Sequence, residues 1–141
     1  MTALLYHELG HIWHDAIGTL YHDTNSISEK SLWQLYQEGI AMYCEQLLLN
    51  DFSSYHQDKN NWLGWCNKNR KDIFIEYKKR VDENESTQDF FGDWCNYLEH
   101  SDVGYYLGCE LLKSLSSKYP MTKLANLEIN DIYSELCNIV K

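Results

Sequence analysis

The decapeptide YHELGHIWHD, residues 6–15, contains three histidines and two acidic residues, and its HELGH core fits the pattern His-Glu-x-x-His. On an α-helix, residues four apart lie on one face, so His7 and His11 can direct their imidazoles at one metal ion. Glu8 is turned about 100° from His7. There its carboxylate can accept a proton from water activated by the metal. The pattern predicts a zinc site with Glu8 as general base; the alternative is two surface histidines on an amphipathic helix.

A catalytic zinc site needs three protein ligands and one open position. The best source of the third ligand is LYQEGIAMYCE, residues 35–45, which contains Glu38 followed by Gly39. A glycine inside a helix costs about 1 kcal/mol relative to alanine. That cost is explained if another helix or a ligand must approach closely there. Glu38 is therefore the strongest candidate for the third ligand; the alternative is a solvated helix face.

Two further polar residues follow the motif. His14 is seven residues beyond His7, about 10.5 Å along a helix. One ion cannot easily reach both, so we expect His14 to be an outer partner of the site or simply solvated. Asp15 is four residues after His11. It could fix a ligand imidazole by a hydrogen bond, or lie at a solvated helix end.

Together, HELGH and QEGIAMY resemble the gluzincin metallopeptidases, in particular the aminopeptidase-N-like branch, whose second motif reads roughly Asn-Glu-Gly-x-Ala-x-Tyr. The resemblance implies that His7, His11 and Glu38 are ligands of Zn²⁺ and that Glu8 is the general base. Such an enzyme would hydrolyse peptide bonds in a peptide or protein substrate.

A third segment, GYYLGCELL (residues 104–112), is similar to the family's Tyr-x-x-Gly helix. In that family the tyrosine hydroxyl stabilises the oxyanion, which points to Tyr105. A neutral phenol is a suitable donor to such an oxygen. The alternative is that Tyr105 is a core aromatic residue.

The chain also departs from this family. The gap from His11 to Glu38 contains 26 residues, longer than is usual in that branch, and only six residues precede His7. We therefore expect the family's N-terminal β-sheet to be absent. A start codon assigned too late, a fragment or a degenerate descendant would each explain this. A second chain or a missing N-terminal segment could complete the cleft.

Two other functions remain open. One is a catalytically inactive zinc-binding or interaction module descended from a truncated peptidase. The other is a four-helix di-iron protein, which needs two Glu-x-x-His elements and two further glutamates. Glu8 and His11 supply one such element, and no other histidine follows a glutamate at that spacing. The di-iron alternative is therefore the weaker one.

The elements that must position these residues are predicted to be helices. The sequence has one proline and no alternating run of β-branched residues, so no strand is predicted. We expect a single all-α domain, residues 1–141, forming a bundle of about five to seven helices. By the resemblance, it corresponds to the C-terminal helical part of a gluzincin catalytic domain. The expected helices are residues 2–17, 32–50, 62–81, from 86 or 87 to 98, 103–118 and 131–140.

Composition restricts partners and location. Six aromatic residues at helical spacings are expected to fill the core: Trp62, Trp65, Phe90, Phe91, Trp94 and Tyr97. A net charge of −9 argues against nucleic acid and anionic membranes as partners. No apolar run approaches the roughly 20 residues of a membrane span. Five scattered cysteines and no recognisable signal peptide predict free thiols in a cytoplasmic protein.

Overall fold

The computed structural model describes residues 2–92 and 96–141, and this part of the chain is helical without a named strand. Tyr97 and His100 form one isolated bridge. The prediction of an all-α bundle of five to seven helices is confirmed. The α-helices are α1 (Thr2–Ile17), α2 (Ile27–Leu49), α3 (Trp62–Lys68), α4 (Arg70–Asp82), α5 (Val103–Ser116), α6 (Met121–Leu124) and α7 (Ile129–Ile139), and a short 3₁₀ helix, η1, covers Gln88–Phe90.

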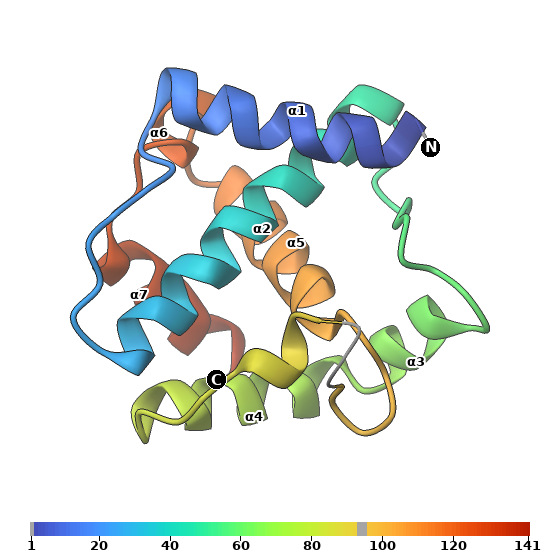
Figure 1. Cartoon of the computed structure of the whole chain (residues 1–141), viewed down its shortest axis with the longest axis vertical. Helices are drawn as coiled ribbons and strands as arrows, with labels where there is room; N and C mark the ends of the chain where they lie inside the picture. Colours follow the sequence, from blue (N-terminus) through green and yellow to red (C-terminus); the bar gives the residue numbers. More distant parts are fainter. Residues whose placement is uncertain (1, 93–95) are drawn as a thin grey trace.

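Helix α2 runs through the middle of the molecule and contacts α1, α4, α5 and α7 (Figure 1). Its crossing with α5 is so close that no side chain fits between the backbones. A Cβ added at Gly39 would lie 2.4 Å from the carbonyl oxygen of Gly108, and one added at Gly108 would lie 2.6 Å from that of Leu35. The expectation that Gly39 permits close approach of another helix is confirmed.

A second glycine brings α1 against the C-terminal half of α2. A Cβ added at Gly10 would lie 2.9 Å from Cα of Ala41 and 2.9 Å from Cβ of Cys44. Gly10 lies between His7 and His11 in the helix, so the same contact that joins the helices brings these histidines close to α2. The buried residues of α1 are His7, Gly10 and His14.

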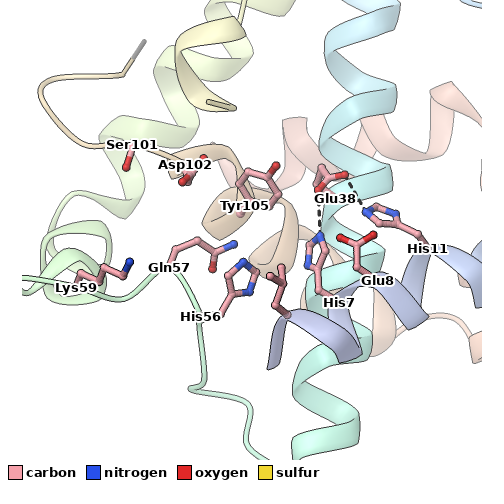
Figure 2. Close-up of a pocket in the computed structure, with 11 residues that line it drawn as sticks. His7, Glu8, His11, Glu38, His56, Gln57, Lys59, Ser101, Asp102 and Tyr105 are labelled. Atoms are coloured by element: carbon pink, nitrogen blue, oxygen red, sulfur yellow. Dashed lines mark hydrogen bonds and ion pairs between the residues drawn. The ribbon is translucent and has the colours of Figure 1, made fainter. Parts of the chain in front are cut away.

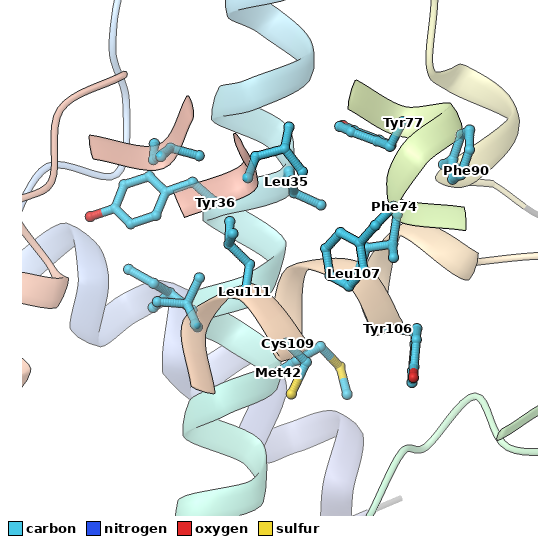
Figure 3. Packing of buried hydrophobic residues seen from close by; sticks show 14 of the residues in the cluster. Leu35, Tyr36, Met42, Phe74, Tyr77, Phe90, Tyr106, Leu107, Cys109 and Leu111 are labelled. Atoms are coloured by element: carbon cyan, nitrogen blue, oxygen red, sulfur yellow. The ribbon is translucent and has the colours of Figure 1, made fainter. Parts of the chain in front are cut away.

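Aromatic and aliphatic side chains from α2, α4, α5 and η1 form the core (Figure 3). Two of its buried phenols donate hydrogen bonds to main-chain oxygens: Tyr36 donates to Leu124 at 2.6 Å, and Tyr77 donates to Ser31 at 2.7 Å. Hydrogen bonding of this kind removes the cost of burying a hydroxyl. Of the aromatic residues predicted for the core, Trp62 and Phe90 are buried, Trp65, Phe91 and Tyr97 are partly buried, and Trp94 lies outside the described residues.

Two helix boundaries differ from the prediction. Helix α2 begins at Ile27 rather than 32, because Ser26 caps it by accepting a hydrogen bond from the backbone N–H of Glu29. The predicted helix 62–81 is divided in two at Asn69. The side-chain amide of Asn69 donates to the carbonyl of Trp65 at 2.9 Å, a local bond that competes with continuation of the helix.

The predicted helix from 86 or 87 to 98 is wrong in the residues that the structure describes. Only the 3₁₀ turn η1 forms there, and Leu98 and Glu99 have positive φ angles of 49° and 67°, which an α-helix does not allow. Residues 93–95 lie outside the described part. The sequence also did not predict α6, which follows Pro120, or the start of α7 at Ile129, where Glu128 and Asp131 form a capping box.

Two composition-based expectations bear on the described residues. The described cysteines, Cys44, Cys66, Cys109 and Cys137, are free thiols. Among the described helices, none combines the length and the apolar character that crossing a membrane requires.

Candidate metal centre

Of the HELGH segment, His7, Gly10 and His11 lie on the side of α1 that is directed at α2. His7 is buried and His11 is partly buried, and their ring centroids are 5.0 Å apart. Regular helical geometry places residues four apart on the same side, and the Gly10 contact brings that side against α2. The geometry of a single helix therefore directs both imidazoles to the same side, as the sequence predicts.

Glu38 reaches the same point from α2. Its Oε2 lies 3.2 Å from Nε2 of His7, and its Oε1 lies 3.0 Å from Nε2 of His11 (Figure 2). One ligand atom from each of the three residues lies within 4.8 Å of the others. Zinc bonds of about 2.0–2.1 Å in a tetrahedron separate ligand atoms by about 3.3 Å. The three predicted ligands therefore meet with a spacing that fits zinc with little movement.

Contacts among Glu38, His7 and His11 shift the pKa values of this cluster. Burial acts to raise the pKa of Glu38, but hydrogen bonds with His11 and His7 outweigh it and hold the pKa at about 2. Burial lowers the pKa of His11, but the hydrogen bond to Glu38 and the charges of Glu38 and Glu8 raise it overall. Glu38 is thus ionised at neutral pH, as metal ligation requires, and a metal ion must compete with a proton for His11.

Glu8 is an exposed residue that lines the same cavity as the three ligands. Figure 2 shows its side chain between those of His7 and His11, on the cavity side of α1. A carboxylate in this place can exchange protons with water in the cavity. The position agrees with the base role that the sequence predicts.

Tyr105 comes from the first turn of α5, and its ring centroid is 5.8 Å from that of His7. The close crossing at Gly39 and Gly108 brings this turn toward Glu38. Burial and the nearby Glu38 carboxylate raise the pKa of Tyr105, so its phenol stays protonated at neutral pH. Tyr105 is partly buried at the cavity wall, where its hydroxyl can donate a hydrogen bond.

Sequence reasoning did not identify two residues behind His7. Glu45 is fully buried, with Oε1 3.7 Å from Nδ1 of His7 and 2.6 Å from Nδ1 of His56. The signal for Glu45 was present, because it follows Glu38 by seven residues, two helical turns on the same face. His56 lies in the loop between α2 and α3, and no spacing in the sequence connects it to the site.

The other two polar residues of the N-terminal motif lie away from the ligand atoms. His14 is fully buried, with its ring 5.0 Å from that of Tyr36, so the expectation of a solvated His14 is wrong. Burial is the largest influence on its pKa, which falls to about 4. Asp15 is exposed near the end of α1, which agrees with the solvated alternative.

The three predicted ligands line a cavity of about 540 Å³. Figure 2 shows the three predicted ligands at one end and Lys59, Ser101 and Asp102 at the other. Its wall is formed by Leu4, His7, Glu8, His11, Glu38, His56, Gln57, Lys59, Ser101, Asp102 and Tyr105. The cavity is large enough for a few residues of an extended peptide, and its polar groups come from three helices and two loops.

Comparisons with protein-family models, curated proteins and solved structures found no match to this chain. The resemblance to gluzincins therefore rests on the three sequence motifs and stays a prediction.

Proposed function

We propose that the chain is a zinc-dependent metallopeptidase in which His7, His11 and Glu38 hold one Zn²⁺ ion. The observation that carries the proposal is the convergence of three ligand atoms, from two helices, within 4.8 Å at the wall of a cavity that Glu8 and Tyr105 also line. Two buried polar atoms nearby, Nδ1 of His7 and Oε2 of Glu45, have no hydrogen-bond partner among the described residues. Unpaired buried groups of this kind are costly and are typical of functional sites.

Zinc bound in this way supplies a Lewis acid that lowers the pKa of water to about 7. The chain's own residues perform the proton transfers. Glu8 accepts the proton of the attacking water and later delivers it to the leaving amine. Tyr105, kept protonated by burial and by Glu38, donates a hydrogen bond to the carbonyl oxygen as negative charge develops on it.

Replacement of Glu8 by Gln tests this division of roles. We expect Glu8→Gln to keep one zinc per chain and to lose peptide hydrolysis by about 10²- to 10⁴-fold, because only the proton acceptor is removed. Zinc content would be measured by atomic emission, and hydrolysis with a mixed peptide library analysed by mass spectrometry. Equal hydrolysis by the variant would reject Glu8 as the base, and a wild-type chain without zinc affinity would reject the metal site.

A second candidate is a zinc-binding module that acts by association rather than hydrolysis. Exposed apolar side chains favour it: Leu5, Leu9 and Ile12 on α1, with Leu48 on α2. A groove of about 300 Å³ between these helices has a mostly apolar wall. Single exposed apolar residues are ordinary, but contiguous ones mark interaction surfaces. Zinc binding without hydrolysis of any library peptide would favour this candidate.

A further inference from the structure

His56 is held against the metal-binding group from outside the two helices that carry the ligands. Its ring centroid is 5.3 Å from that of His7, with the rings nearly perpendicular at 80°. Figure 2 shows His56 beside His7 at the cavity wall. The residue is therefore close enough to influence a ligand imidazole without sharing its helix.

The loop that carries His56 is fixed to α2 and α5 in the residues just before His56. The side-chain amide of Gln46 donates to the carbonyl of Ser54 at 2.8 Å, and Nζ of Lys113 donates to that of Phe52 at 2.5 Å. Tyr55, next to His56, is buried in the core cluster. These contacts hold the chain in place immediately before His56.

Glu45 connects His56 to the ligand. Nδ1 of His56 donates to Oε1 of Glu45 at 2.6 Å, while Nδ1 of His7 lies 3.7 Å from the same oxygen. Glu45 is fully buried, and a buried carboxyl group needs a close hydrogen-bond partner to offset its loss of contact with water. His56 supplies that partner and so fixes the direction in which the carboxylate faces His7.

We infer that His56 is a positioning residue for the metal site, acting through Glu45 on the ring of His7. With Glu45 fixed, His7 could keep its Nδ1–H toward the carboxylate and direct an unprotonated Nε2 at the proposed zinc position beside Glu38 and His11. Partners behind a ligand histidine set its tautomer and orientation in this way. The inference rests on the proposed zinc site.

The same three residues offer another arrangement, because His7, Glu45 and His56 could themselves hold an ion. That arrangement would use Nδ1 of His7 as a ligand. An imidazole that already binds metal through Nε2 would then have to lose its remaining N–H. The positioning role keeps that proton and is therefore the one we propose; the second metal position is an outcome of the test.

Zinc affinity, measured by competition with a chromophoric chelator, tests the inference. We expect His56→Ala to weaken binding about 10- to 100-fold, as loss of an outer partner does. His56→Asn, which keeps a donor near Nδ1, should retain most of the affinity. The control is His22→Ala, since His22 is exposed. The absorption spectrum of the Co²⁺-loaded chain should change in His56→Ala and not in His22→Ala.

A pair of variants separates a role through Glu45 from general damage to the fold. If His56 acts through Glu45, combining His56→Ala with Glu45→Gln should weaken binding by less than the two separate losses combined. Unchanged affinity in His56→Ala would overturn the inference and leave the zinc site intact. Two zinc ions per wild-type chain, with one lost in His56→Ala, would also overturn it by making His56 a ligand. A wild-type chain that binds no zinc would overturn both this inference and the proposed function.

Discussion

Helices α1 and α5 both pack against α2 and both carry residues of the proposed site, but they differ in the side chains that they bury. Helix α5 buries apolar residues such as Val103, Leu107 and Leu111 and crosses α2 closely at Gly108. Helix α1 buries His7, Gly10 and His14, while Leu5 is 57% exposed and Ile12 is 63% exposed. A helix normally turns its apolar side inward. The reversal in α1 agrees with the proposed zinc site, because local rules of burial are most often broken at functional sites.

The largest expected consequence concerns the metal. Apolar burial holds α5 in place, whereas α1 depends more on contacts among its histidines and Glu38, so zinc should stabilise α1 selectively. At a free zinc concentration about 1,000 times the dissociation constant, the chain should gain about 4 kcal/mol of unfolding free energy. Hydrogen exchange should slow in residues 2–17 much more than in residues 103–116.

The matched variant for this experiment is Glu38→Gln, which removes a ligand charge with little change in size. It should lose the zinc-dependent gain and bind zinc more weakly than the variants that change only outer partners. Equal zinc protection of α1 and α5 would remove the distinction between the helices. Full protection in Glu38→Gln would show that the ion binds elsewhere.

The difference between the two helices also explains which features of the site could be predicted from the sequence. His7, His11 and Glu38 were predicted because helical spacing is local and the motifs name the residue types. The close approach at Gly39 was predictable for the same reason, since a mid-helix glycine is costly. The apolar periodicity of α1 identified a helix but not its buried face, because that choice depends on α2. His56 could not be predicted, since tertiary contacts of its loop bring it to Glu45.

His14 sharpens the comparison between the two helices. It is a titratable group on the buried face of α1, whereas the buried face of α5 is mostly apolar. Burial lowers its pKa to about 4, below the value of about 6.5 in an unfolded chain. Between these values the unfolded state binds more protons, so His14 should cost the fold roughly 3 kcal/mol as the pH falls from 6.5 through 4. Above pH 6.5 this cost is absent, because His14 is then neutral in both the folded and the unfolded state.

Replacement of His14 by Leu should remove this part of the pH dependence. Urea unfolding of the metal-free chain at several pH values would measure it, with His22→Leu as the exposed control. We expect the unfolding free energy of His14→Leu to fall less between pH 6.5 and 4 than that of the wild type or the control. The same slope in all three proteins would mean that folding does not lower the pKa of His14.

The smallest expected effect tests the other helix. At Gly108, α5 contacts α2 through backbone atoms, and an added Cβ would lie 2.6 Å from the carbonyl oxygen of Leu35 and 2.9 Å from Cα of Gly39. Gly108→Ala should therefore destabilise the chain by about 1–3 kcal/mol, the usual cost of overpacking. Without a clash, alanine would instead stabilise the helix by about 1 kcal/mol. Chemical denaturation would measure the change, with Ser134→Ala at an exposed position of α7 as the control. The sign of the change decides whether rigid backbone contact, rather than adjustable side chains, fixes α5 and with it Tyr105 against α2.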